Sequence, residues 1–199
     1  MDNNLIHNRI CVYCASSTQT PEKYMEQGRR FSEILAAEKI DLVFGGSRSG
    51  LMGVMADRIM ELGGRAVGIM PRFMMEGEWH HHSLSELILV ETMADRKDLM
   101  ISNVDAVVTF PGGCGTMEEF METLSNKRLG TFSKPMIILN SFGFYDPLLQ
   151  LLDSMIGNRF LRERHREMWT VVSTPEEILP AILSARPWDS EARSFALVQ

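Results

Sequence analysis

Glycines and a threonine gather in residues 111–119, PGGCGTMEE, between an apolar run and a helical pattern. Such a segment lies where a strand turns into a helix. The backbone amides of Gly112, Gly113 and Gly115 can approach a ligand closely, and the free amides of a helix start favour an anion. With the hydroxyl of Thr116, they can surround a phosphate group.

Two carboxylates, Glu118 and Glu119, end the same segment. They would occupy the first turn of the following helix, where the helix dipole favours the ionised form. An ionised carboxylate beside an anion-binding loop suits a reaction in which positive charge develops on a sugar next to a phosphate. The alternative is that both acids only stabilise the helix start, which is common at such positions.

A second glycine-rich turn, residues 44–53, reads FGGSRSGLMG and also lies between a strand pattern and a helix pattern. Gly45, Gly46, Gly50 and Gly53 would let the backbone come close to a phosphate or a ribose. The segment matches neither GxxxxGK[ST] nor GxGxxG. A tight turn without a ligand therefore remains the alternative.

A third segment, residues 93–97, reads MADRK and opens a helix after a strand end. Adjacent Arg96 and Lys97 would, taken alone, indicate a solvated helix face. The segment does not stand alone, since the two glycine-rich turns precede and follow it in the sequence.

These segments need a scaffold of parallel strands. Short apolar runs rich in β-branched residues recur at residues 10–13, 42–44, 66–70, 87–90, 106–110, 136–139 and 170–172. Such runs are typical of strands that are covered on both faces, and the stretches between them carry helical periodicity. The sequence predicts an α/β fold, a doubly wound and mostly parallel sheet with helices on both faces.

Helices are expected at residues 51–62, from residue 93 to about 103, and after Gly113. Another should begin with Thr20 as N-cap and Pro21 as the first helical residue. Residues 71–85 have no clean period and predict a loop or a short irregular helix. We expect one domain over residues 1–199, with residues 185–199 as a surface tail.

Composition favours a globular protein, with 45% apolar and 23% charged residues. The formal net charge of −6 gives no overall positive field for a nucleic-acid backbone or an anionic membrane. No apolar run is long enough to span a membrane, and the first residues, MDNNLIHNR, do not resemble a signal peptide. We expect a cytoplasmic protein with a small-molecule substrate and no nucleic-acid or membrane partner.

The cysteines and histidines indicate neither disulfides nor a metal site. Cys11, Cys14 and Cys114 are odd in number, and period-two alternation sends the first two to opposite faces of a strand, so we expect buried thiols there. Histidines occupy residues 80–82, close to Glu78. Consecutive residues of a helix or strand cannot all converge on one ion, so no metal is expected.

Taken in order, the three segments resemble the LOG family of cytokinin riboside 5′-monophosphate phosphoribohydrolases, whose older label is lysine decarboxylase-like. The resemblance begins at CVYCASS and runs through LVFGGSRSGLMG, GGRAVGIMP, ETMADRKDLM, PGGCGTMEEF and KPMIILNSFGFYDPLL, covering roughly residues 10–150. An RK dipeptide followed by PGGxGTxxE is far more specific than either glycine turn alone.

The resemblance implies hydrolysis of an adenine-type nucleoside 5′-monophosphate to the free base and ribose 5-phosphate, without a cofactor, by a homodimer. It assigns the catalytic pair to Arg96 and Glu119. It assigns substrate binding to Ser16, Gly45, Gly46, Gly50, Met52, Gly53, Glu78, Lys97, Gly112, Gly113, Gly115, Thr116, Glu118 and Thr123. The family's histidine near its loop glutamate matches His81, which suggests a contact on the base side.

Two other functions remain open at this point. A nucleotide or molybdenum-cofactor carrier on the same fold would need the glycine turns but not both Arg96 and Glu119. A decarboxylase would need pyridoxal phosphate on a lysine, and no lysine stands in a recognisable context for it. Departures from the family pattern, among them Cys114 in PGGCGT and ADRK in place of HERK, leave the identity of the base open.

Overall fold

The computed structural model describes residues 5–77, 79–188 and 192. Its strands form a parallel sheet in the order β4-β3-β2-β1-β5-β6-β7. They are β1 (Arg9–Tyr13), β2 (Asp41–Phe44), β3 (Ala66–Pro71), β4 (Glu86–Val90), β5 (Ala106–Thr109), β6 (Met136–Leu139) and β7 (Thr170–Val172). Every apolar run predicted as a strand is one, which confirms the doubly wound α/β fold.

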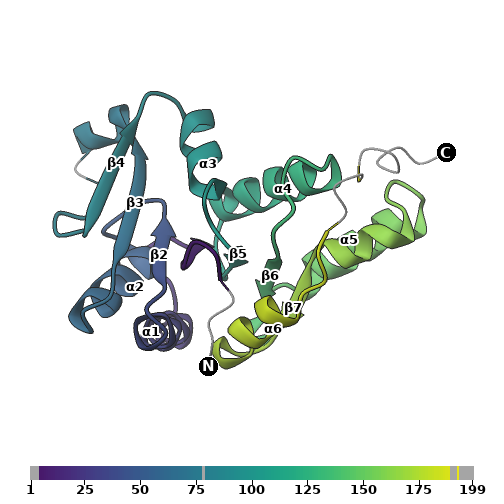
Figure 1. Ribbon diagram of the computed structural model, residues 1–199, viewed down its shortest axis with the longest axis horizontal. Helices are drawn as coiled ribbons and strands as arrows, with labels where there is room; N and C mark the ends of the chain where they lie inside the picture. The colour runs from purple at the N-terminus through teal and green to yellow at the C-terminus, as the bar shows by residue number, and fades with distance from the viewer. Residues whose placement is uncertain (1–4, 78, 189–191, 193–199) are drawn as a thin grey trace.

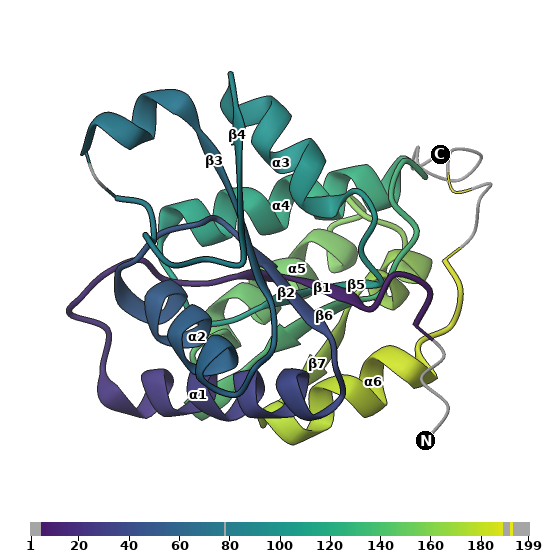
Figure 2. The same ribbon diagram turned by 60° about the vertical axis from the view of Figure 1, so that its left-hand side comes forward.

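Helices cover both faces of the sheet. One face packs against α1 (Glu22–Ala37), α2 (Gly50–Glu61) and α6 (Ile178–Ser184), and the other against α3 (Met93–Ile101), α4 (Cys114–Arg128) and α5 (Asp146–Gly157). Figure 1 shows α1 below β2 and α4 above β6. The turned view of Figure 2 shows the same layers.

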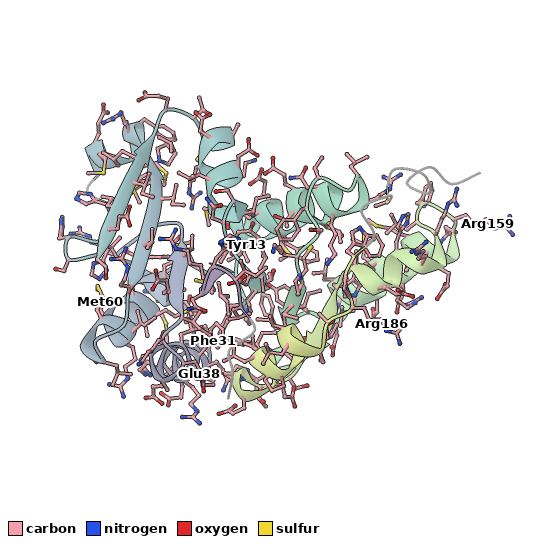
Figure 3. The ribbon with its side chains drawn as sticks, viewed as in Figure 1. Tyr13, Phe31, Glu38, Met60, Arg159 and Arg186 are labelled. Atoms are coloured by element: carbon pink, nitrogen blue, oxygen red, sulfur yellow. The ribbon has the colours of Figure 1, made fainter. Side chains whose placement is uncertain are left out.

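Alternation along the strands divides the core into two clusters. Ile10 and Val12 of β1 point to the face that holds Phe31, whereas Cys11 and Tyr13 point to the opposite face. Figure 3 labels Tyr13 and Phe31 in the interior of the molecule, on either side of β1. Each cluster is apolar, so burial of both sheet faces stabilises the fold.

The two cysteines of the CxxC lie in different clusters, as their spacing predicts. Cys11 and Cys14 are both buried, and both thiols are free. Burial raises the pKa of the Cys14 thiol well above its usual range, and the charge of Glu119 raises it further. The prediction of buried thiols at these positions is therefore confirmed.

Several local expectations are wrong. Helix α1 begins one residue later than expected, because Pro21 is its N-cap and the Thr20 hydroxyl donates instead to the Ser17 carbonyl oxygen at 2.8 Å. The edge strand β7 is not covered on both faces, since Thr170 and Val171 are exposed. An edge strand has a neighbour on one side only, and the apolar run alone does not show this.

The expected surface tail also differs from the structure. Trp188 and Ala192 are buried in the cluster beside α4 and α5. The Trp188 indole N–H donates to the Lys127 carbonyl oxygen at 2.7 Å. The chain therefore packs against the end of α4 at Trp188, and neither Trp188 nor Ala192 lies on the surface.

The sheet brings the candidate segments together at its centre. Strand β1 pairs with β2 on one side and with β5 on the other. The strand order therefore reverses at β1, and the loops that follow β1, β2 and β5 leave from the same edge. In parallel sheets, ligands bind at the carboxyl ends of the strands at such a reversal.

None of the helices within the described residues has both the length and the apolar character needed to cross a membrane.

Candidate active site

A cavity of about 570 Å³ opens at this reversal point. It is lined by the loop after β1, the first glycine turn, the connection between β3 and β4, and the starts of α3 and α4. The lining residues are Cys14, Ala15, Ser16, Ser17, Gly45, Ser47, Ser49, Met52, Met74, Trp79, Arg96, Gly113, Cys114, Gly115, Thr116 and Glu119. Its size and its mixed polar and apolar walls suit a small organic ligand.

Arg96 and Glu119 form a buried ion pair in this cavity. The Arg96 Nη2 and Glu119 Oε1 atoms are 3.2 Å apart, and the two side chains are only 7% and 5% exposed. The Arg96 Nε–H donates to the Ile69 carbonyl oxygen at 3.0 Å, which fixes the plane of the guanidinium. The two residues on which the sequence placed catalysis therefore meet, although they lie on different helices.

The start of helix α3 determines where Arg96 points. The Thr92 hydroxyl accepts from the Asp95 backbone N–H at 3.0 Å, and the Asp95 carboxylate accepts from the Thr92 backbone N–H at 3.1 Å. This capping box satisfies two amides at the helix start and defines its first turn. Arg96 follows directly, so its side chain leaves the helix at a defined angle.

Gly45 provides the space that the Arg96 guanidinium occupies. A Cβ atom at residue 45 would lie 2.0 Å from the Arg96 Nη2 atom, far inside any allowed contact. Gly112 does the same for Thr116, whose Oγ1 atom would be 2.1 Å from an added Cβ. These two glycines make room for polar side chains of the site.

Burial raises the pKa of Glu119 to about 7, against the opposing effect of the Arg96 charge, with a smaller contribution from Glu118 that also raises it. A carboxyl group with a pKa near neutrality, inside a cavity, is typical of groups that exchange protons during catalysis. The expectation that Glu118 and Glu119 lie in the first turn of the helix is wrong, because α4 begins at Cys114 and both acids fall in its second turn, where burial outweighs any effect of the helix start on Glu119. The place of Glu119 inside the cavity fits the chemical role that the motif predicts.

The first turn of α4 forms one end of the cavity. Gly113 is the N-cap of this helix, whose first backbone amides have no partner within the helix. A Cβ atom on Gly113 or Gly115 would meet nothing within 4 Å, so the space beside them is open. Thr116 is buried and lines the same end. Free amides, a helix dipole and a hydroxyl together suit a phosphate.

Lys97 ties helix α3 to helix α4 and does not line the cavity. Its Nζ atom pairs with Glu118 and, at 2.7 Å, with the Glu122 Oε2 atom. Hydrogen bonds to these two carboxylates raise the pKa of Lys97. These contacts lie next to the Arg96 and Glu119 pair, so they hold the two helices in register around it. Helices α3 and α4 lie side by side in Figures 1 and 2.

The structure divides the predicted site residues into three groups. Those that line the cavity are Ser16, Gly45, Met52, Arg96, Gly113, Gly115, Thr116 and Glu119. Those that lie outside its lining are Gly46, Gly50, Gly53, Lys97, Gly112, Glu118 and Thr123. Glu78 lies outside the described residues.

Three residues of the second group contact neighbouring parts of the chain. Gly50 has a φ of +62°, and a Cβ atom there would lie 2.5 Å from the Ser16 carbonyl carbon. The same atom on Gly53 would lie 2.0 Å from the Arg48 carbonyl oxygen. The Thr123 hydroxyl hydrogen-bonds to the Tyr13 hydroxyl at 2.8 Å in the core.

Cavity residues that sequence reasoning missed include Cys14, Ala15, Ser17 and Cys114. The first three end the segment CVYCASS, and a loop that leaves the carboxyl end of a central strand is a signal that could have found them. In the described part of the chain, no group of three or more His, Cys, Asp or Glu residues is placed to hold a metal ion.

Comparisons with known proteins show which family the chain resembles over most of its length. Residues 52–182 match a family model described as "possible lysine decarboxylase". The chain is 34% identical to the cytokinin riboside 5′-monophosphate phosphoribohydrolase LOG2 of Arabidopsis thaliana, over 95% of this chain and 93% of that protein. It is 32% identical to LOG5 of the same plant, over 90% of this chain and 78% of that protein.

The chain belongs to the LOG family. The resemblance inferred from its motifs is therefore confirmed. The paired motifs that define the resemblance, around Arg96 and Glu119, supply the buried ion pair of the cavity.

Solved structures share the fold of this LOG-family chain. A molybdenum cofactor binding protein from Rippkaea orientalis matches with a TM-score of 0.67 at 22% identity, over 88% of this chain and 95% of that chain. The molybdenum cofactor carrier protein of Chlamydomonas reinhardtii matches with a TM-score of 0.67 at 18% identity, over 89% and 96%. At these identities, the likeness concerns the fold alone.

Proposed function

We propose that this LOG-family chain is a phosphoribohydrolase that cleaves the N-glycosidic bond of an adenine-type nucleoside 5′-monophosphate, giving the free base and ribose 5-phosphate. The observation that carries the proposal is the buried Arg96 and Glu119 pair, 3.2 Å apart, in the same cavity as the open start of helix α4. The relatives LOG2 and LOG5 carry the name of this activity.

The phosphate of the nucleotide would bind at the start of α4. The backbone amides beside Gly113 and Gly115 and the hydroxyl of Thr116 supply hydrogen-bond donors there, and the helix dipole adds a favourable field. Binding of the phosphate at this end would direct the ribose towards Glu119, which lies in the second turn of the same helix.

Glu119 would act on the sugar. Departure of the base leaves an oxocarbenium-like ribose, whose positive charge an adjacent carboxylate stabilises. As the C1′–N bond breaks, the oxygen of a water molecule bonds to C1′ and one proton of that water passes to Glu119. Glu119 then gives this proton to the departing base, so that one water supplies both the hydroxyl of the ribose and the hydrogen of the free base. Because burial holds the pKa of Glu119 near 7, the carboxyl group can accept and release that proton at neutral pH.

Arg96 would keep Glu119 available in its charged form. Its guanidinium lowers the pKa of the carboxyl group against the larger effect of burial. Because the Arg96 Nε–H is bound to the Ile69 carbonyl oxygen, the guanidinium stays in place when the ligand enters. Arg96 lines the cavity, and a guanidinium has further N–H donors that suit ribose hydroxyls.

The base would bind against Met52, Met74 and Trp79, which line the cavity and whose side of it we call the base end. An indole and two thioethers offer a flat apolar surface with adaptable neighbours. Such a surface fits adenine, with or without an apolar substituent. The names of the relatives favour a cytokinin nucleotide as the preferred substrate.

We also propose that the protein works as a cytoplasmic homodimer of one-domain subunits. A groove of about 430 Å³ between α4 and α5 supports the dimer, because its lining includes Leu151 and Phe160, which are 51% and 73% exposed. Large exposed apolar side chains around a groove are typical of protein interfaces. The net charge of −6 supports a small-molecule substrate over nucleic acid or a membrane surface. The molar mass in solution, from light scattering, tests the dimer.

The activity is tested by incubating the purified protein with AMP and with isopentenyladenosine 5′-monophosphate and measuring release of the free base by chromatography. We expect release from at least one nucleotide and almost none with Glu119→Gln. Equal release by Glu119→Gln would reject the role of Glu119. Binding of both nucleotides without release would reject hydrolysis and favour a carrier.

A further inference from the structure

The connection between β3 and β4 is attached to the first glycine turn at one short stretch. After the 3-10 helix η1 (Arg72–Gly77), the Arg48 backbone N–H donates to the Trp79 carbonyl oxygen at 3.0 Å. The His81 backbone N–H donates to the Gly46 carbonyl oxygen at 2.9 Å. Residues 79–81 therefore lie as a short antiparallel segment along the turn that lines the cavity.

The side chain of His81 adds a third attachment, to helix α2. The His81 residue is only 8% exposed, and its Nε2 atom is 2.8 Å from the Asp57 Oδ1 atom. The Ser83 backbone N–H donates to His81 Nδ1 at 3.2 Å. Since Nδ1 accepts this hydrogen bond, the ring proton belongs on Nε2, which donates it to Asp57.

Both ring nitrogens of His81 are thus occupied by protein groups. The sequence resemblance suggested that this histidine contacts the base, but His81 does not line the cavity. The residue of the same segment that does so is Trp79, which is 54% exposed. His81 is therefore placed to act on the ligand through the position of Trp79.

We propose that the hydrogen bond between Asp57 and His81 is a latch that holds Trp79 at the base end of the cavity, which makes Asp57 and His81 positioning residues for base recognition. The assignment of this end to a base rests on the proposed function. The connection between β3 and β4 contains no strand, and long connections of this kind are often functional and mobile unless they are tied down. Among the described residues, this hydrogen bond is the side-chain contact that joins residues 79–81 to helix α2.

The latch is tested with two variants of Asp57 and one control. Asp57→Ala removes the acceptor, whereas Asp57→Asn keeps an oxygen that can still accept from His81 Nε2. Glu61→Gln removes a charge from the same helix, where Glu61 pairs with Arg58 at the surface, and is the matched control. Asp57 is well exposed, so its replacement leaves the core intact.

Two measurements are made on each variant. The first is KM and kcat for AMP and for isopentenyladenosine 5′-monophosphate. The second is acrylamide quenching of Trp79 fluorescence, obtained as the difference between each protein and its Trp79→Phe counterpart. For Asp57→Ala we expect KM to rise about fivefold, as for the loss of one ordinary hydrogen bond, with kcat unchanged and Trp79 more easily quenched.

Asp57→Asn and Glu61→Gln should match the parent protein in both measurements. An unchanged KM together with unchanged quenching in Asp57→Ala would overturn the latch. A fall in kcat without a change in KM would overturn it as well, because it would indicate a loss of folded protein. The quenching result needs no turnover, so an absence of base release from the parent protein would reject the proposed hydrolysis and leave quenching to decide on the latch.

Discussion

Replacing Gly45 by alanine should disable the site although Arg96 and Glu119 themselves are kept. The added Cβ atom would lie 2.0 Å from the Arg96 Nη2 atom, whereas ordinary contact begins at about 3.4 Å. The guanidinium must therefore move by more than an ångström. That movement breaks its contact with Glu119 or its hydrogen bond to the Ile69 carbonyl oxygen.

A misplacement of about 1 Å in a catalytic group can cost about 100-fold in rate, and we expect kcat/KM of Gly45→Ala to fall by about that factor. The overpacked interior should also lower the free energy of unfolding by about 1 to 3 kcal/mol. Base release at saturating and limiting nucleotide gives the first quantity, and urea unfolding gives the second.

Two other glycines serve as matched controls for Gly45→Ala. A Cβ atom on Gly28 would meet the Leu51 Cδ1 atom at 2.4 Å, between α1 and α2, so Gly28→Ala tests overpacking away from the site. A Cβ atom on Gly157 would meet nothing within 4 Å. Gly28→Ala should lose stability but keep kcat/KM, and Gly157→Ala should keep both. If Gly45→Ala turned over like Gly28→Ala, the reasoning about Arg96 would be refuted.

Three further predictions concern titration and the phosphate. Because burial raises the pKa of Glu119 to about 7, kcat/KM should rise with pH through that value as the carboxylate forms. Glu119→Asp should shift the midpoint of this rise. If ionisation of the substrate phosphate caused the rise instead, the midpoint would be the same in both proteins. Thr116→Val should raise KM for AMP about tenfold yet leave the affinity for adenosine unchanged, and an equal loss for both would contradict a phosphate contact. Burial lowers the pKa of Lys127 to about 8 from 10.5, so the unfolded chain binds more protons between these values and stability should rise with pH across this window. Across this window the unfolding free energy of the parent protein should rise by up to about 3 kcal/mol more than that of Lys127→Met. A difference between the two proteins that does not vary with pH would reject the lowered pKa of Lys127.

The strands and the catalytic pair could be predicted because their signals are local. Buried parallel strands need continuous apolar runs, and these runs are present in the sequence at every strand. Arg96 and Glu119 each lie in a short motif at the start of a helix, and strand order alone brings such starts together. The expectation that residues 80–82 bind no metal ion stays a prediction.

Tertiary packing decided what the sequence could not show. Trp188 stands in a polar segment, and its burial depends on the Lys127 carbonyl oxygen at the end of α4. His81 was expected to contact the base, but the buried hydrogen bond to Asp57 on another helix gives its ring a different partner. Gly50 and Gly53 were expected to contact the ligand, yet neighbouring backbone fills the space beside them.

The pairing of β1 with β5 determines when this site can form during folding. Ile10 aligns with Ala106, so closing the centre of the sheet joins parts of the chain that are far apart in sequence. Closure of so long a loop costs entropy before the contacts are made, and it is slow compared with helix formation. Arg96 lies within that loop and Glu119 beyond it. During refolding, the return of base release therefore reports closure of the sheet centre, whereas helical signal returns earlier.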